Sequence, residues 1–518
     1  MGLKIWLQPS VVEGTEQGAT EAALTAAESF DGFDRLLNVR ACRLLSGMNF
    51  PTFCWRGKAI PSCFAVLVLL SIGLLAAERP NIVFILADDL GYGDLGCYGR
   101  TDIKTPVLDR LAAEGVRLTQ HYANGPECTP TRAAFLTGRY PQRIGGLECA
   151  IGTGNVGRYD DAIRLRASDE LGLPDTENTI ARRLREVGYR TALYGKWHLG
   201  YELKFQPDRH GFDHSFYCVG GGMDYFHYLD TAGGYNLFQD GKPVRRDGYF
   251  TDLMTDDAID FVSQQEGDDP FFLYLAYTCP HSPFQGPDDQ QPDPLPLDSP
   301  LWRQGSAPPD VYIAMIEHMD RCIGRFLDAL DRLQLSDNTV IIFAGDNGGT
   351  ASARNVPLSG IKGSTYEGGI RVPAIVRWPG VIPAGKLSSQ VSATFDFTRS
   401  IARLGGVEVA ASDTFDGMDI LAQLAKGQAV VERTLFWRKP RGETVWKGVR
   451  KGNLKFVARE RGLRYEEHLY DLGQDPGETV DLRSSRPDDL AALRSRYLRW
   501  EAESRQNRRG RPGWLAAE

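Results

Sequence analysis

Four mainly apolar runs in this chain each break abruptly into polar residues. They cover residues 82–87, 190–195, 271–277 and 339–345 and are rich in branched and aromatic side chains. Continuous apolar runs of about four to eight residues are typical of strands that are buried on both faces of a sheet. The pattern therefore predicts four interior strands, each followed by polar residues.

Segments with helical periodicity lie between these runs. Apolar residues recur every three or four positions over residues 106–115, 179–187 and 311–333. Strands that alternate with helices predict an α/β fold, with a mostly parallel sheet between two layers of helices. In such sheets ligands bind at the carboxyl ends of the strands, and all four polar junctions fall at that edge.

The pattern changes after about residue 425. Four short runs separated by glycines and charged residues follow, at 435–437, 445–446, 454–457 and 468–472. They indicate a small antiparallel sheet, and a charged helix is expected near residues 487–503. Residues 283–310, dense in proline and aspartate, form an excursion on the side of the polar junctions, where we expect part of a substrate rim.

The chain before residue 80 is predicted to serve export. Residues 64–77 are uncharged, with Ser71 as the single polar interruption. A run of this length fits the apolar part of a signal peptide better than a membrane span, which needs about 20 residues. Segment 48–77 is therefore predicted to be a signal peptide cleaved near Ala77, with an uncleaved anchor as the alternative. Residues 1–47 are left without a function.

Composition narrows the classes of function. The 518 residues are 42% hydrophobic and 24% charged, which excludes a polytopic membrane protein and a wholly disordered chain. A formal net charge of −8 argues against a nucleic-acid-binding surface but leaves room for a local basic pocket. The nine cysteines include no Cys-x-x-Cys pair, so a thiolate zinc site is not expected. One or two disulfides are possible after residue 80, in pairings that the sequence does not specify.

The most informative segment is 125–132. Pro130 favours the first turn of a helix and Gly138 its end, which places Cys128 at the helix N-terminus, where an anion is favoured. Arg132 lies one turn away on the same face. By spacing alone, Cys128 is either a buried or disulfide-bonded cysteine or a nucleophilic thiol of low pKa.

Hard oxygen ligands follow two of the predicted strands. Asp88 and Asp89 come after the first, and Asp346 and Asn347 come after the fourth. Each pair alone is equally well explained as a solvated turn. Together at one edge they suit Ca²⁺ or Mg²⁺ rather than a soft metal.

These motifs resemble those of a known family. Cys128-x-Pro130-x-Arg132 is similar to the maturation signature of the type I, formylglycine-dependent sulfatases, except that Thr131 stands where serine is more frequent. Further blocks similar to the family's occur in the family's order at 80–94, 105–115, 137–140, 195–200, 280–281, 345–348 and 362–373. The resemblance spans about residues 80–485.

The resemblance implies an arylsulfatase-like member of the alkaline phosphatase superfamily. Its fold would be a large mixed, mostly parallel sheet sandwiched by helices, with a smaller C-terminal antiparallel sheet plus helix. The implied organisation is a catalytic domain at 78–424, a C-terminal subdomain at 425–504 and a tail at 505–518.

The implied activity is that of an exported sulfuric ester hydrolase, periplasmic or secreted. A maturation enzyme would convert Cys128 to formylglycine (3-oxoalanine), whose hydrate attacks sulfur and carries the sulfate until the second hydroxyl expels it. The family favours Ca²⁺, with Mg²⁺ as the alternative. The implied metal ligands are Asp88, Asp89, Cys128 as formylglycine, Asp346 and Asn347.

The resemblance also implies roles for cationic residues. His198 is the candidate base near position 128, and His281 is the candidate acid for the leaving oxygen. The groups expected to surround the sulfate are Arg132, Lys196 and Lys362. Two further residues have less specific expectations, because His210 either reaches substrate or orders a loop and Arg371 serves as structural support.

Other functions remain open from sequence. A phosphoester or phosphonate monoester hydrolase uses the same scaffold, and a non-catalytic binder of sulfated glycans would keep Cys128 unmodified. The expected partner is a sulfated glycan or small molecule, with carbohydrate favoured and aryl or steroid sulfates left open. We expect no nucleic acid and no stable membrane partner.

Overall fold

The computed structural model describes residues 79–152, 159–265, 269–410 and 415–506. The chain divides into two units, 1–78 and 79–518, of which only the second is described here. The predicted signal segment 48–77 therefore lies outside the described residues. In the part of the chain that is described, no helix has both the length and the apolar character needed to cross a membrane.

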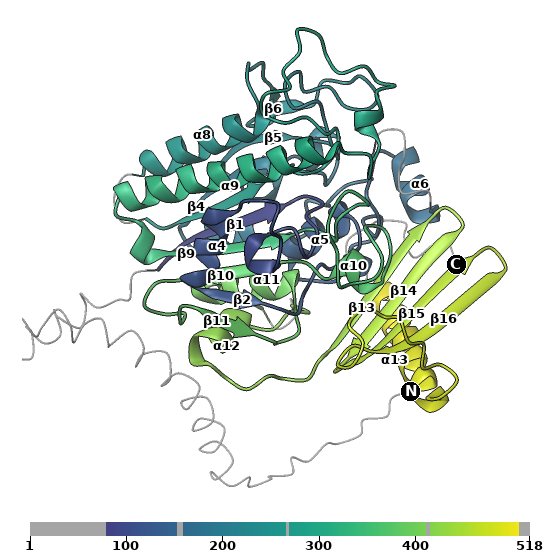
Figure 1. Cartoon of the computed structure of the whole chain (residues 1–518). Coiled ribbons are helices and arrows are strands. Elements are labelled where there is room, and N and C mark those ends of the chain that lie inside the picture. Colours follow the sequence, from purple (N-terminus) through teal and green to yellow (C-terminus); the bar gives the residue numbers. More distant parts are fainter. Residues whose placement is uncertain (1–78, 153–158, 266–268, 411–414, 507–518) are drawn as a thin grey trace, which may run out of the picture. The chain divides into compact units, whose positions relative to one another are not determined.

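A ten-stranded sheet lies at the centre of the unit (Figure 1). The four predicted interior strands are adjacent in it and parallel, in the order β9 (Thr339–Gly345), β1 (Asn81–Ala87), β8 (Phe271–Ala276) and β4 (Arg190–Lys196). Every residue of β1, β8 and β9 is buried. The prediction of interior strands is thus confirmed.

Shorter strands complete the sheet on both sides. Beside β4 lie β5 (His214–Cys218), β6 (Leu237–Gln239) and β7 (Lys242–Pro243), and beside β9 lie β10 (Ala374–Arg377), β2 (Val116–Leu118) and β11 (Lys386–Ser388). β5 is parallel to β4, whereas β6, β7, β10 and β2 pair antiparallel to their inner neighbours. The sheet is therefore mixed around a parallel centre, as expected.

Helices cover both faces of this sheet. One face is covered by α5 (Cys128–Thr137), α7 (Ile180–Glu186), α11 (Thr394–Leu404) and α12 (Ile420–Lys426), and the other by α4 (Pro106–Ala113), α8 (Phe250–Ser263) and α9 (Pro309–Arg332). The three predicted helices are α4, α7 and α9. The remaining elements are α6 (Asp160–Ala167), α10 (Glu367–Ile370), the pair β3 (His121–Tyr122) and β12 (Ser392–Ala393), and the 3₁₀ turns 96–98, 141–143, 203–205, 207–210, 300–302 and 336–338.

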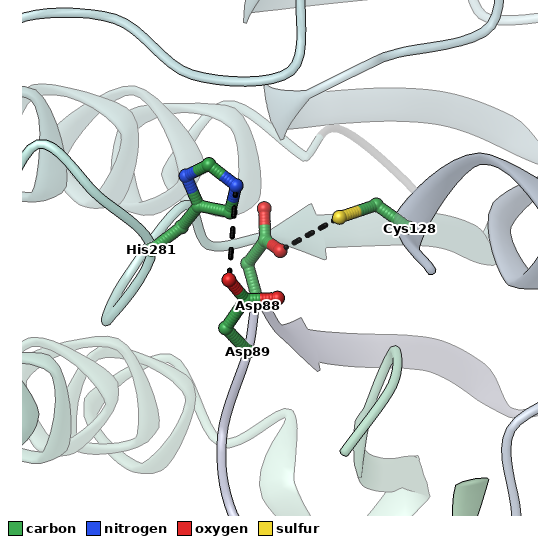
Figure 2. Close-up of side chains that lie close together, drawn as sticks. All are labelled: Asp88, Asp89, Cys128 and His281. Atoms are coloured by element: carbon green, nitrogen blue, oxygen red, sulfur yellow. Dashed lines mark hydrogen bonds and ion pairs between the residues drawn. The ribbon is translucent and has the colours of Figure 1, made fainter. Parts of the chain in front are cut away.

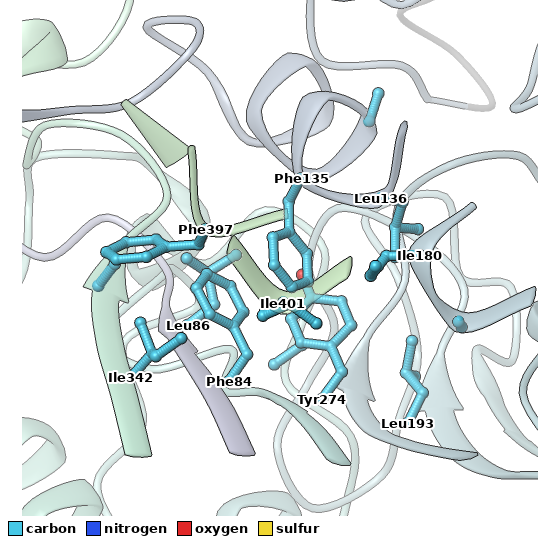
Figure 3. Packing of buried hydrophobic residues seen from close by; sticks show 14 of the residues in the cluster. Phe84, Leu86, Phe135, Leu136, Ile180, Leu193, Tyr274, Ile342, Phe397 and Ile401 are labelled. Carbon is cyan, nitrogen blue, oxygen red and sulfur yellow. The ribbon is translucent and has the colours of Figure 1, made fainter. Parts of the chain in front are cut away.

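Strand β1 shows how the two cores arise. Successive side chains of a strand point to opposite faces, so Phe84 enters one core and Ile85 the other. Phe84 stacks on Phe135 of α5 with ring centroids 3.8 Å apart, and Tyr274 of β8 lies 5.2 Å from Phe135 (Figure 3). This packing fixes α5, which begins with Cys128, against the centre of the sheet.

A separate four-stranded antiparallel sheet follows, as predicted. It consists of β13 (Thr434–Arg441), β14 (Thr444–Lys451), β15 (Leu454–Arg461) and β16 (Arg464–Asp471). Helix α13 (Pro487–Gln506) packs on one face, where Trp500 stacks on Phe436 at 5.0 Å. The opposite face contacts the larger domain, where Trp437 donates to the Ala123 carbonyl at 2.8 Å.

A buried ion pair joins the small sheet to the larger domain. Lys455 Nζ of β15 lies 2.6 Å from Glu367 Oε1 in α10 and 3.1 Å from Glu478 Oε1, and all three side chains are fully buried. Removing one partner from a buried ion pair costs about 3–5 kcal/mol, because the other charge is left uncompensated.

We therefore expect Lys455→Met to lower the free energy of unfolding by about 3–5 kcal/mol, measured by chemical denaturation. The matched control is Lys451→Met in β14, because Lys451 is 41% exposed and pairs with the exposed Glu432. This control is expected to change stability by less than about 1 kcal/mol. Equal stability of the two variants would show that the buried pair does not hold the sheet in place.

Candidate active site

The polar residues of all four junctions meet at the carboxyl edge of the parallel strands. Asp88 and Asp89 follow β1, Lys196 ends β4, His281 lies beyond β8, and Asp346 follows β9. Strand pairing puts these ends side by side, because Ala87 is opposite Gly345 and Leu86 is opposite Ala276. The predicted convergence of these residues on one edge is therefore observed.

Cys128 begins helix α5 at this edge. Gly138 ends the helix in the left-handed conformation, with φ of 71°. Cys128 Sγ donates to Asp88 Oδ1 at 3.1 Å (Figure 2). Lys362 Nζ lies 3.5 Å from the sulfur. The side chain at position 128 is thus in direct contact with both an acidic and a basic group.

The thiol of Cys128 is not activated here. Burial raises its pKa well above the ordinary value, and the negative charges of Asp346 and Asp88 raise it further. The six cysteines in the described part of the chain are all free. The interpretation of Cys128 as a low-pKa thiol is therefore wrong, because burial, and after it the two carboxylates, outweighs the effect of the helix N-terminus. The interpretation as half of a disulfide is also wrong, because the cysteine is free.

Asp88 lies among positive charges. Lys196 Nζ forms a short ion pair with Asp88 Oδ2, and Arg132 Nη2 lies 3.4 Å from the same oxygen. Burial alone would raise the pKa of Asp88, but the charges of Lys196, Arg132 and Lys362 hold it well below the ordinary value. Asp88 is therefore a carboxylate.

Arg132 connects the aspartate that follows β1 to the aspartate that follows β9, because it contacts both Asp88 and Asp346. Its Nε and Nη2 donate to Asp346 Oδ2 at 3.2 and 2.9 Å, and its Nη1 donates to the Lys196 carbonyl at 2.9 Å. The guanidinium is fully buried. Arg132 thus fixes the ends of β4 and β9 relative to α5.

Asn347, which follows Asp346, has one side-chain oxygen without a hydrogen-bond donor in the described residues. Asn347 Nδ2 donates to Asp89 Oδ1 at 2.7 Å, and Lys362 Nζ lies 2.7 Å from the same oxygen. Asn347 Oδ1 is buried and has no hydrogen-bond partner among the described residues. A buried amide oxygen without a donor, next to carboxylates, is a fitting ligand for a hard cation.

Both predicted histidines line the site as neutral rings. His198 Nε2 donates to the Ile151 carbonyl at 2.6 Å, and burial, followed by the charge of Lys196, lowers its pKa well below the ordinary value. His281 Nδ1 donates to the Ser282 carbonyl at 2.5 Å, which leaves Nε2 3.7 Å from Asp89 Oδ2. Burial lowers the pKa of His281 to about 4.

These groups border a cavity of about 810 Å³. Cys128, His198, His281 and Lys362 line it, whereas Arg132, Lys196 and the aspartates lie behind its wall. Trp302 and Gln304 from the excursion 283–310 also line the cavity, which confirms that segment as a rim. The small sheet adds three lining residues that the sequence does not predict: Lys439, Arg441 and Trp446.

Burial and contacts show what His210 and Arg371 do in the fold. His210 is fully buried against Trp197, with ring centroids 5.5 Å apart, and does not line the cavity, so it orders its loop. Arg371 donates to the Thr119 carbonyl and pairs with Glu367, which is the structural support expected of it.

Among the described residues, two groups of side chains have ligand atoms close enough to hold a metal. The first is Asp88, Asp89, Cys128 and His281 (Figure 2). The second, Asp252, His318 and Cys322, lies on α8 and α9. There Arg325 Nη1 already donates to Asp252 at 3.0 Å. The group at the sheet edge is the one that adjoins the large cavity.

Fold and site together define a hydrolase of the alkaline phosphatase superfamily. The family model described as Sulfatase matches residues 80–407, and the chain belongs to the sulfatase family. It is a sulfuric ester hydrolase. In the part of the chain that is described, the large mixed sheet with a separate four-stranded sheet has the alkaline-phosphatase-like fold of its structural neighbours.

Relatives of known activity match over most of the chain. N-acetylgalactosamine-6-sulfatase of Canis lupus familiaris is 32% identical over 83% of this chain and 87% of its own length. Steryl-sulfatase of Rattus norvegicus is 31% identical over 74% of this chain and 80% of its own. The crystal structure of Ps i-CgsB superposes with a TM-score of 0.71 at 31% identity, over 83% of this chain and 94% of that one.

The cavity wall near His281 has no room for a larger residue at position 222. A Cβ on Gly222 would lie 2.9 Å from the Ser282 carbonyl oxygen and 3.1 Å from the His281 ring. We expect Gly222→Ala to displace that ring and to lower kcat/KM for a sulfate ester roughly 10- to 100-fold, without a change in unfolding midpoint.

The matched control is Gly286→Ala, whose Cβ would meet its nearest atoms at the ordinary distances of 3.4 and 3.5 Å. It is expected to retain activity. Full activity of Gly222→Ala in 4-nitrophenyl sulfate assays would place the reaction elsewhere.

Proposed function

We propose that the protein removes sulfate from a sulfated carbohydrate, using formylglycine made from Cys128 and a bound Ca²⁺ ion. The observation that carries the proposal is the convergence of three carboxylates and three cationic groups on the side chain at position 128. Membership of the sulfatase family is consistent with both formylglycine and a bound Ca²⁺ ion.

The residues at the sheet edge fit a hard divalent cation. Asp88, Asp89, Asp346 and Asn347 offer carboxylate and amide oxygens, and Asn347 Oδ1 lacks a donor. Such oxygens suit Ca²⁺ and, less readily, Mg²⁺. When bound, the cation would withdraw negative charge from sulfate oxygens.

Position 128 also fits a modified residue better than a thiol. A thiol kept neutral by burial is a weak nucleophile and a poor ligand for a hard cation. The hydrate of formylglycine supplies an oxygen nucleophile at the N-terminus of α5. A maturation enzyme acting on Cys128 is therefore part of the proposal.

The cationic side chains bind and orient the sulfate in this proposal. Lys362 lines the cavity and contacts position 128, so it is placed to donate to a sulfate oxygen. Arg132 and Lys196 lie behind it, where they hold the carboxylates in fixed positions. Their charges stabilise negative charge that develops on the sulfate.

The two histidines would move protons. His198 donates its Nε2 proton to Ile151, so its Nδ1 is the atom free to accept a proton near position 128. His281 holds its proton on Nδ1, so its Nε2 must first gain one before it acts as an acid toward the leaving oxygen. His281 lines the cavity, where a leaving alcohol has access to it.

A carbohydrate substrate is supported by the relatives. The solved structure of Ps i-CgsB in complex with k-i-k-neocarrahexaose matches with a TM-score of 0.70 at 30% identity. N-acetylgalactosamine-6-sulfatase is likewise named for a sulfated sugar. We also propose that the chain acts after export, on the basis of the apolar segment 64–77.

We expect Cys128→Ala and Cys128→Ser to lose turnover of 4-nitrophenyl sulfate while nearly keeping their unfolding midpoint, because the nucleophile is lost with only a small change in packing volume. Wild-type protein is expected to hydrolyse 4-nitrophenyl sulfate faster than 4-nitrophenyl phosphate.

Peptide mass spectrometry should show a loss of about 18 Da at Cys128, the change from thiol to aldehyde.

An intact thiol in protein from a host with maturation machinery would favour a non-catalytic glycan binder. Faster turnover of the phosphate would favour the phosphoester or phosphonate alternative. The fold alone leaves that alternative open, since a phosphonate monoester hydrolase of Agrobacterium radiobacter superposes with a TM-score of 0.59 at 19% identity.

Asp346→Ala is expected to lose bound metal and activity together, as measured by elemental analysis and kinetics on the same sample. The matched control is Asp416→Ala, because Asp416 also forms a paired contact with an arginine, Arg143, but lies away from the cavity. Retention of a full equivalent of metal by Asp346→Ala would remove this residue from the ligand set.

A further inference from the structure

The small sheet presents an arginine-rich face next to the cavity. Strand register places Lys439, Trp446, Arg459 and Glu466 in one row across β13, β14, β15 and β16. The next row on the same face, two residues closer to the hairpin ends, is Arg441, Thr444, Arg461 and Arg464. We call these two rows the arginine face.

Contacts show which side of the sheet this face is on. Lys439, Arg441 and Trp446 line the cavity, so the two rows face it. The intervening residues face the opposite side, where Lys447 pairs with Glu460 at 2.9 Å and Arg494 of α13 pairs with Glu467. Because side chains alternate along a strand, Arg461 and Arg464 lie on the cavity side.

The part of the face nearest the cavity is held rigidly. Glu127, next to Cys128, lies 3.1 Å from Lys439 Nζ and 2.7 Å from Arg441 Nη1. Lys439 Nζ also donates to the Gly363 carbonyl at 3.1 Å, beside Lys362. One carboxylate thus ties two cations of β13 to the residues around position 128.

The outer part of the face has an excess of positive charge, with Arg459, Arg461 and Arg464 set against Glu466. Arg459 lies over the Trp446 ring at 5.3 Å, and within the described residues no ion pair involves Arg459, Arg461 or Arg464. Arg461 and Arg464 are directly opposite each other in the β15–β16 hairpin and are both exposed. Like charges at such positions destabilise a sheet, so folding alone does not account for them.

From these observations we propose that the arginine face binds further acidic groups of an oligosaccharide whose sulfate ester lies at position 128. The inference rests on the proposed function and extends it to the class of substrate, an acidic glycan of several sugars. Guanidinium groups pair with sulfate or carboxylate through parallel hydrogen bonds, and Trp446 offers a flat apolar surface between them.

The dimensions suit more than one sugar. From β13 to β16 the outer row crosses three strand spacings, about 14 Å. The face is also continuous with the cavity through Trp446 and Arg441. A small aryl sulfate would fill the cavity without reaching Arg461 or Arg464, so these arginines should discriminate between substrates by size and charge.

The test compares binding of a heparin hexasaccharide to the full-length protein and two double variants by titration calorimetry. Arg461→Gln/Arg464→Gln is expected to raise Kd about 5- to 10-fold at low salt, with a smaller effect at high salt. The control Arg496→Gln/Arg499→Gln removes the same charge from exposed positions of α13, which packs on the other side of the sheet, and is expected to leave Kd within about twofold.

Further arms identify the groups that bind. A desulfated hexasaccharide that keeps its carboxylates is expected to bind more weakly if sulfates are the ligands and equally if carboxylates are. The proposal is overturned if the wild type does not bind, if both double variants lose affinity equally, or if neither does. It is also overturned if single-stranded DNA of matched charge binds as tightly through the same arginines.

Turnover separates this inference from the proposed function. Arg461→Gln/Arg464→Gln is expected to hydrolyse 4-nitrophenyl sulfate at the wild-type rate, because neither arginine lines the cavity. If no form of the protein releases sulfate but arginine-dependent binding persists, the proposed function fails and the binding face stands.

Discussion

The site depends on the balance of charge at the carboxyl edge of the sheet. Asp88, Asp89 and Asp346 lie there with almost no access to water, and isolated carboxylates in such a place would be costly. Arg132 and Lys196, which are equally buried, pair with two of them, and Lys362 pairs with the third. The ion pairs that offset the cost of burying these carboxylates thus leave both negative and positive groups at this edge. Such an arrangement suits a cation and an anionic substrate.

This balance explains why the elements around the site are so firmly connected. Arg132 reaches the aspartates only because α5 packs against β1, and the stacking of Phe135 on Phe84 holds the helix there. Lys362 needs its loop to be held, and Lys439 of β13 contacts the neighbouring Gly363. The small sheet is therefore part of the support of the active site as well as part of its wall.

The sequence predicts the centre of the fold and the convergence of most candidate site residues on one edge of the sheet. Long apolar runs identify β1, β4, β8 and β9 because burial on both faces leaves a strong pattern, and the parallel arrangement then places their polar ends together. Strands such as β7, with two residues, and β2, with three, carry too little pattern to be recognised. The raised pKa of the Cys128 thiol could not be predicted from the sequence either, because it depends on how deeply the side chain is buried and on the nearby charges of Asp346 and Asp88.

The cavity-lining residues of the small sheet could not be predicted from the sequence for a different reason. In the sequence, Lys439 and Arg441 are two charges in a short strand, which is the usual appearance of a solvated edge. Only the fold shows that Glu127, which is adjacent to Cys128 and far from both in the sequence, forms ion pairs with both of them. Because Glu127 links the start of α5 to β13, a change in the register of β13 would move the cations that line the cavity without altering the carboxylate edge. In the proposed function, chemistry and substrate selection would thus be carried by separate elements that are joined at one carboxylate.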